Sequence, residues 1–387
     1  MTSTGFSRLA LLTLGTVAAL SLAVLLASGE LGVGTASAQA QAPRELRVLA
    51  GVGQDTLGAF GYFPETVRIR AGDMVTWQIN SDLVHTVSFT TGTAPEGPTR
   101  GNSFGPAGEV IPGANIPVPE GPTGVQMRNP VELFPTRAPG APVETYRGEG
   151  YFNSGRLYRE PLVPGVLGFQ TFSLVFDTPG VYRYLCLVHP EGMSGTVEVL
   201  TASTRDLPDQ ADVDAQAQAE MAAILSLSER ARAVGSTARS LPGPNDTTIW
   251  SVRAGNLQTQ INDFRVQLDE FLPKDITVRS GDPVVWESIN AHTVTFIPVP
   301  PAPEWHPLEL GPDGVPRLLS LPVATALARP AAVYEPTQYF NSGNISGASP
   351  SGRTSFILTF ERPGTFEYRC LIHGERGMVG SITVVPR

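Results

Sequence analysis

Short stretches in which hydrophobic and polar residues alternate follow one another along most of the chain. Val75 and Trp77 occupy every second position, and the alternation returns in FSLVF at 172–176. A period of two places successive side chains on opposite faces of a strand. Turn signals, AGD at 71–73 and TPG at 178–180, separate these stretches. The pattern predicts an all-β fold built from antiparallel sandwiches.

The alternating stretches occur twice in the same order, which indicates two copies of one domain. The repeated blocks are FPETVRIRAGDMVTW (63–77) and LPKDITVRSGDPVVW (272–286), HTVSF (85–89) and HTVTF (292–296), YFNSG (151–155 and 339–343), FSLVFDTPGVYRYLC (172–186) and FILTFERPGTFEYRC (356–370), and GMSGTVEV (192–199) and GMVGSITV (377–384). We expect the first domain at 39–203 and the second at 244–387.

Two segments fall outside the repeated blocks. Residues 204–243 are Ala-rich, with acidic residues early and Arg230 and Arg232 late, which predicts a helical linker whose charges suit the helix dipole. Residues 91–150 are rich in Gly, Pro and small polar residues, and we expect a long surface insert there with little regular structure.

The N-terminus carries an apolar run from about Leu9 to Ala27, followed by Ala36-Ser37-Ala38, which fits a small-x-small cleavage rule. We expect residues 1–38 to be a secretory signal peptide and the protein to be exported, periplasmic or extracellular. An uncleaved membrane anchor is the alternative, because the run approaches the length of a membrane span.

Composition narrows the class of partner. The formal net charge is −9, which argues against nucleic acid or an anionic membrane surface, so a membrane is a partner only if the N-terminal segment stays attached. Gly 40 and Pro 35 favour turns and short strands over long helices.

The residues able to bind a soft metal are few, and they lie at equivalent places in the two copies. The chain has two Cys and five His. The candidate ligand sets are His85, Cys186, His189 and Met193 in the first copy, and His292, Cys370, His373 and Met378 in the second.

Two imidazoles, a thiolate and a weak thioether suit a type 1 copper site that transfers electrons. A disulfide between Cys186 and Cys370 is one alternative, although it would join the same position of two separate domains. Zinc is the other, although structural zinc seldom accepts three strong ligands plus Met. His306, in PEWHPLEL, has no counterpart in the first copy and is expected to be a loop residue.

These motifs resemble the cupredoxin family, which includes plastocyanin, pseudoazurin and halocyanin. The resemblance lies in Gly-Asp with Trp, then His-Thr-Val, then Pro-Gly-x-Tyr/Phe-x-Tyr-x-Cys-x2-His and Gly-Met-x-Gly, and it covers both copies. It implies two tandem Greek-key sandwiches, each with copper near one end and with the late His, His189 or His373, as the port for electrons.

The first copy departs from this pattern because its Cys-x2-His-x3-Met spacing is one residue shorter than Cys-x2-His-x4-Met in the second. We still expect Met193 to be the axial ligand of the first site, as Met378 is of the second. Thr86 and Thr293 stand where many cupredoxins carry Asn, and we expect their hydroxyls to bond to the Cys loop.

The predicted function is that of an electron-transfer protein with two type 1 coppers, working between redox protein partners and catalysing no reaction. The alternatives are a copper storage or delivery protein, an oxidase-associated copper module, and a two-domain copper oxidase or nitrite reductase. An enzyme of the last kind would need further His clusters, and only His306 is left over.

Overall fold

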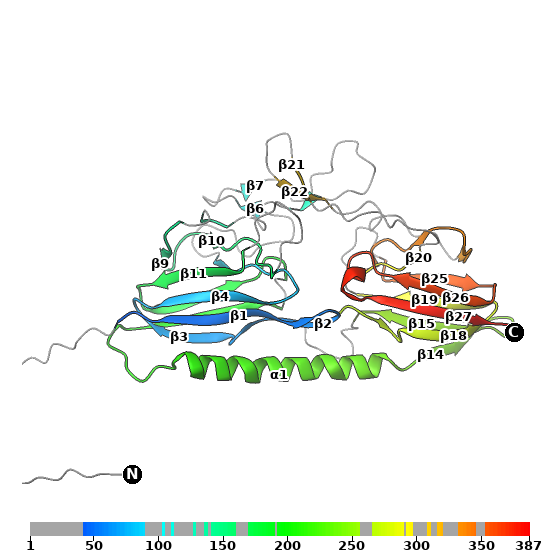
Figure 1. Ribbon diagram of the computed structural model, residues 1–387, viewed down its shortest axis with the longest axis horizontal. Helices are drawn as coiled ribbons and strands as arrows, with labels where there is room; N and C mark the ends of the chain where they lie inside the picture. The colour runs from blue at the N-terminus through cyan, green and yellow to red at the C-terminus, as the bar shows by residue number, and fades with distance from the viewer. Residues whose placement is uncertain are drawn as a thin grey trace, which may run out of the picture. The chain divides into compact units, whose positions relative to one another are not determined.

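The computed structural model describes residues 42–89, 103–104, 110–111, 127–128, 135–137, 141–159, 169–189, 192–255, 265–289, 292–296, 308–310, 316–319, 332–345 and 353–387. The predicted signal peptide, at 1–38, lies outside these residues. Within them the chain is almost entirely β, with one long helix (Figure 1), as the alternating pattern predicts.

The first sandwich consists of two sheets that enclose one apolar core. One sheet has the order β16 (Val266–Leu268), β2 (Leu57–Phe63), β1 (Glu45–Gln54), β4 (Met74–Ser81), β11 (Thr171–Phe176), β9 (Glu144–Tyr146). The other has the order β10 (Phe152–Asn153), β5 (Ser88–Phe89), β12 (Gly180–Leu185), β13 (Ser194–Leu200), β3 (Thr66–Arg70).

The second sandwich repeats this arrangement. One sheet has the order β14 (Arg239–Pro242), β15 (Thr248–Ala254), β19 (Asp282–Glu287), β25 (Ser355–Phe360), β23 (Ala332–Val333), with β17 (Phe271–Leu272) also paired to β15. The other has the order β18 (Asp275–Arg279), β27 (Val379–Val385), β26 (Gly364–Arg369), β20 (Thr295–Phe296), β24 (Phe340–Asn341).

Each core is centred on the tryptophan of its repeated block. Trp77 and Trp286 are both fully buried, and each ring meets a tyrosine edge-on, with centroids 5.0 Å from Tyr184 and 5.3 Å from Tyr368. Inward-facing residues alternate with outward-facing ones along β4 and β25, because side chains on a strand point to opposite faces in turn. Both tryptophans are therefore core residues of their sandwiches.

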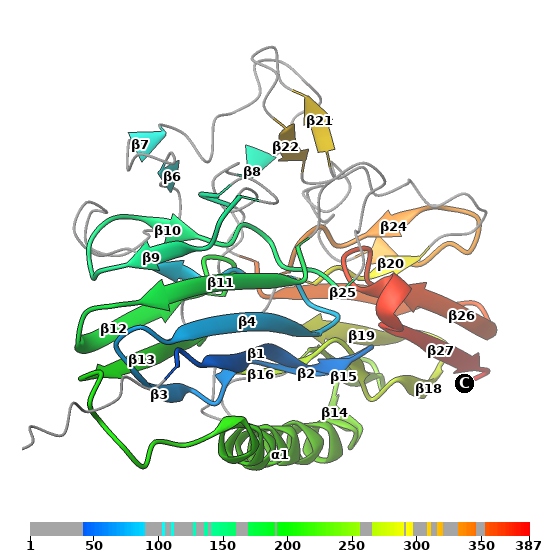
Figure 2. The same ribbon diagram turned by 60° about the vertical axis from the view of Figure 1, so that its left-hand side comes forward.

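The helix α1 (Gln210–Gly235) lies within the predicted linker. It begins where the Asp209 side chain accepts a hydrogen bond from the Asp212 amide, while the Asp212 side chain accepts one from the Asp209 amide. This reciprocal pair is a capping box, which satisfies amides that the first helical turn leaves free. Figures 1 and 2 show α1 running alongside β1 and β2, and it also contacts β16.

The end of the predicted linker is part of the second sandwich. Strand β14, at Arg239–Pro242, pairs antiparallel with β15 although all four of its side chains are exposed. Its pairing is carried by backbone hydrogen bonds, so no hydrophobic alternation marks it in the sequence.

The two sandwiches are joined by backbone pairing. Strand β16, which follows β15 in the second copy, pairs antiparallel with β2 of the first, with Gln267 opposite Gly58. The amide of Phe60 donates to the Arg265 carbonyl, and the amide of Asp269 donates to the Thr56 carbonyl, each over 2.7 Å. We call this paired region the junction. Residues Ala40–Arg387 accordingly form one compact unit.

Parts of the two long inserts carry short strands. In the first insert, β6 (Ser103–Phe104) pairs with β7 (Val110–Ile111). In the second, β21 (Leu308–Leu310) pairs with β22 (Pro316–Leu319), and β22 pairs in turn with β8 (Met127–Arg128) of the first insert. Among the described residues, no helix is long and apolar enough to cross a membrane.

Candidate metal centre

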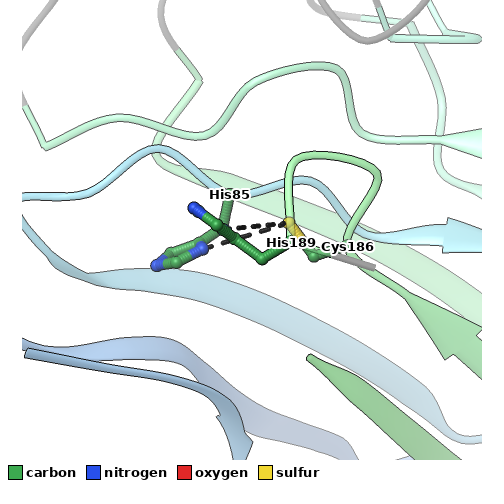
Figure 3. Close-up of side chains that lie close together, drawn as sticks. All are labelled: His85, Cys186 and His189. Atoms are coloured by element: carbon green, nitrogen blue, oxygen red, sulfur yellow. Dashed lines mark hydrogen bonds between the residues drawn. The ribbon is translucent and has the colours of Figure 1, made fainter. Parts of the chain in front are cut away.

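Two groups of side chains, one in each sandwich, bring two imidazoles and a thiol together. In the first, Cys186 follows directly after β12, His189 lies three residues further on, and His85 comes from the segment between β4 and β5 (Figure 3). The Cys186 sulfur lies 4.0 Å from His85 Nδ1 and 3.7 Å from His189 Nδ1. The structure thus assembles three ligands that lie up to 104 positions apart.

The second group has the same construction. Cys370 follows β26, and its sulfur lies 3.9 Å from His292 Nδ1 and 3.8 Å from His373 Nδ1. The two imidazole Nδ1 atoms are 3.1 Å apart. Three donor atoms at these separations face a common point, as a mononuclear site requires.

At the second site, the separations fit a metal ion held in an almost trigonal plane. With bonds of about 2.0–2.1 Å to nitrogen and about 2.3 Å to sulfur, donor atoms 3.1–3.9 Å apart subtend angles of roughly 100–130°. A trigonal set of two His and one Cys is the arrangement associated with blue copper, rather than with the tetrahedral sites that zinc prefers. Both Cys are free thiols, so the structure contradicts the alternative of a Cys186–Cys370 disulfide.

A threonine after the first His of each site fixes the Cys loop. Thr86 Oγ1 accepts a hydrogen bond of 2.8 Å from the Leu187 amide, and the Thr86 amide donates to the Cys186 sulfur over 3.3 Å. Thr293 does the same for Leu371 and Cys370, at 2.8 and 3.4 Å. The prediction that these hydroxyls bond to the Cys loop is confirmed. The segment that carries the first His is thereby tied to the loop that carries the other candidate ligands.

Burial keeps the site imidazoles neutral. It lowers the pKa of His85, His292 and His373 to about 3, so that their ring nitrogens keep a lone pair at neutral pH. Burial also raises the pKa of the Cys186 thiol, and it raises the pKa of Cys370 to about 11. A thiolate in such a place needs a positive charge beside it, and a bound metal ion supplies one.

The early His of each site fits against a glycine that the sequence motifs did not reveal. Gly51 and Gly255 have φ of +74° and +81°, and a Cβ on either would come within 2.4 Å of the Nε2 atom of His85 or His292. Each glycine therefore makes room for an imidazole ring. Ser81 Oγ lies 2.9 Å from His85 Nε2 and holds that ring with Nδ1 facing the thiol.

The late His differs between the sites in its neighbour. The ring of Phe60 stacks on that of His189, with centroids 3.9 Å apart and planes inclined by 15°. At the equivalent position of the second copy stands Asp269, whose Oδ1 lies 3.6 Å from His373 Nδ1. The two late imidazoles are both only partly buried, so part of each ring is accessible to solvent.

Both methionines lie in the cores beside the ligands. Met193 and Met378 are fully buried, and their carbonyls accept hydrogen bonds from the amides of Cys186 and Cys370 over 2.9 and 3.1 Å. Their role as axial ligands stays a prediction. His306 lies outside the described residues.

Comparison with known proteins gave matches among solved structures alone, since no family model and no curated protein matches the chain. The oxidised plastocyanin of Dryopteris crassirhizoma is 18% identical, and the match covers 35% of this chain and 99% of that one, with a TM-score of 0.19. An oxidised amicyanin variant is 17% identical over 40% of this chain and 82% of its own, with a TM-score of 0.21. A reduced Cu(I) form of another amicyanin variant is 18% identical, over 42% and 89%, also with a TM-score of 0.21.

The fold described above, a pair of all-β sandwiches with one helix, is the arrangement that the sequence motifs predict. The two candidate metal sites are identified from the separations of their His and Cys donor atoms.

Proposed function

We propose that this chain is an exported electron-transfer protein with two mononuclear type 1 copper sites, and that it passes single electrons between protein redox partners. The observation that carries the proposal is the group of two imidazoles and one thiol that converges in each sandwich, with near-trigonal separations at the second site. Copper bound there would alternate between Cu(I) and Cu(II). Met193 and Met378 are proposed as the weak fourth ligands.

The rigidity of the ligand set supports electron transfer. The hydrogen bonds from the Cys loop to Thr86 and Thr293, together with the glycine-lined seats of His85 and His292, hold the donors before any metal arrives. A site that is fixed in advance changes little between oxidation states, and a small rearrangement favours rapid transfer of an electron. The partly buried late imidazoles, His189 and His373, are the proposed points of electron entry and exit.

Catalysis forms no part of the proposal. Four of the five His are used by the two sites, and the described residues hold no third His or Cys cluster of metal-binding spacing. Export is proposed from the N-terminal pattern. The partners are proposed to be redox proteins, one that donates electrons and one that accepts them.

The test is copper content per chain, with visible and EPR spectra, for the wild type and for Cys186→Ser and Cys370→Ser. We expect two coppers per wild-type chain and one in each variant, with an intense thiolate charge-transfer band and a narrow copper hyperfine splitting for each remaining site. Copper bound without that band would favour a storage or delivery role. A wild-type chain that binds no copper would overturn the proposal.

A further inference from the structure

The two ligand loops differ in length by one residue, and the longer loop contacts the opposite sandwich. Between the late His and the Met, the second loop reads GERG and the first reads PEG. Arg376 belongs to the second loop, in the 3₁₀ turn Gly374–Arg376, and the first loop contains no arginine. This side chain therefore distinguishes the second site from the first.

Arg376 reaches out of its own sandwich to the first one. Its Nη2 donates to the carbonyl of Asp55 over 2.7 Å, in the turn between β1 and β2. Gly377, next in the loop, lies so close to this turn that a Cβ would come 3.2 Å from Thr56 Cγ2. The loop that carries His373 and Met378 thus rests on the first sandwich.

The same arginine holds a carboxylate beside the second metal site. Arg376 Nη1 lies 3.0 Å from Asp269 Oδ2, and Asp269 is wholly buried. Both carboxylate oxygens also accept hydrogen bonds of 2.9 Å from Gln267 Nε2. Burying a carboxylate is costly unless it is paired and hydrogen-bonded, so Asp269 depends on Arg376 for its place.

Asp269 connects this pair to both the ligand and the junction. Its Oδ1 is 3.6 Å from His373 Nδ1, and its amide donates to the Thr56 carbonyl of the first sandwich. A ligand, a buried ion pair and an inter-sandwich hydrogen bond therefore share one residue. Movement of the loop away from the first sandwich would separate Arg376 from Asp55. It would also take the guanidinium away from the buried Asp269 carboxylate, whose charge would then be unpaired.

Among the residues that the structure describes, the first site has no corresponding connection. Phe60 occupies the position of Asp269 and stacks on His189 within the same sandwich. Arg376 therefore ties the second site to the opposite sandwich through the Asp55 carbonyl and the Asp269 carboxylate.

We propose that Arg376 and Asp269 are positioning residues that couple metal binding at the second site to docking of its ligand loop on the first sandwich. A docked loop holds His373 in place for the metal, and a bound metal holds the loop in its docked position. Such coupling is reciprocal, because each equilibrium shifts the other by the same factor. The inference rests on the proposed function only in that the second site binds copper.

The test measures Cu(I) affinity by competition with a chromophoric chelator, one site at a time. Cys186→Ser leaves only the second site, and Cys370→Ser only the first. We expect Arg376→Ala to weaken Cu(I) binding at the second site about 10- to 100-fold, the range found for residues that orient metal ligands, and to leave binding at the first site unchanged.

Arg376→Lys keeps the charge but not the two-armed contact, and it should restore part of the affinity. Arg279→Ala, which removes an exposed arginine of the same sandwich, is the matched control.

The reciprocal effect provides a readout that simple destabilisation would not give. In Cys186→Ser, loading the second site with Cu(I) should slow hydrogen exchange at the Asp269 amide by about tenfold or more. In Cys186→Ser with Arg376→Ala or Arg376→Lys, the slowing should be lost or reduced.

Two outcomes overturn the proposal, and they differ in what else they overturn. If Cys186→Ser binds no Cu(I), the proposed function of the second site fails together with the coupling. If it binds Cu(I) with an affinity that both Arg376 variants leave unchanged, the coupling alone fails.

Discussion

At the scale of single residues, each candidate ligand is held by contacts with residues from other parts of the chain. Cys186 and His189 lie close together in the chain, and their recurrence as Cys370 and His373 makes the pattern visible. Gly51, Phe60 and Asp269 are remote in sequence from the ligands they support, so their roles depend on contacts that only the folded chain creates. A signal for one such contact exists in the sequence, because the two ligand loops differ in length and only the second contains an arginine.

The proposed axial ligands can be tested by an exchange of sulfur for oxygen. Met193→Gln and Met378→Gln should each lower the reduction potential of their own site, because a harder oxygen donor stabilises Cu(II) over Cu(I). We expect a shift of about 60 mV or more, a tenfold change for a one-electron couple, measured by spectroelectrochemical titration. Met74→Gln makes the same change at the start of β4 and should move neither potential. Equal potentials in variant and wild type would remove that Met from the ligand set.

The buried imidazoles predict how the metal-free protein responds to acid. His85, His292 and His373 have a pKa of about 3 in the fold, against about 6.5 in an unfolded chain. Between these values the unfolded chain binds more protons, so the free energy of unfolding falls as the pH falls, by about 1.4 kcal/mol per pH unit for each His.

Urea unfolding of the metal-free protein at a series of pH values measures this slope. His85→Gln, with one such group fewer, should show a shallower dependence than the wild type. A free energy of unfolding that stays constant over this range would mean that the imidazoles are not buried as described.

At the scale of elements, periodicity predicts strands wherever one face is buried and fails where backbone pairing alone decides. The alternation along β4 and β25 marks them in the sequence, but β14 is exposed throughout. Strand β16 is hidden for another reason, since all three of its residues are buried and nothing in their order tells which sandwich they join. Whether β16 pairs with an edge strand of the first or of the second sandwich depends on tertiary contacts, and a local sequence pattern does not show these.

Helix α1 is more than a linker, because its apolar side chains cover the junction. Ile224 is 3% exposed and belongs to a cluster with Ala59 and Phe63 of the first sandwich and Val266 of the second. Ile224→Ala should lower the free energy of unfolding by about 2–5 kcal/mol, the usual cost of such a cavity.

Chemical denaturation, with exchange at the Phe60 and Asp269 amides, measures this effect and shows whether it is felt at the junction. Val234→Ala, on the same helix but 49% exposed, should change stability by no more than about 0.5 kcal/mol. Similar losses in the two variants would place Ile224 outside the packed interface.

At the scale of the whole molecule, the repeat predicts two domains, whereas the structure adds that they share a sheet. Because β16 extends the sheet of β2, and because the helix packs on both, unfolding either sandwich exposes part of the other. We expect one cooperative thermal transition for the metal-free chain, with calorimetric and van't Hoff enthalpies that agree. Two resolved transitions in differential scanning calorimetry would show that the sandwiches unfold independently.

The junction has a further property in its symmetry. Aligning the repeats places Gly58 on Gln267, and these two residues stand opposite each other, with equivalent bonds on either side at Phe60 and Asp269. Pairing of a segment with its own counterpart is the signature of a two-fold axis, as in an isologous dimer. The two halves of the chain are thus related at the junction as the protomers of a homodimer are. They differ within this relation, because Phe60 stacks on His189 whereas Asp269 pairs with Arg376.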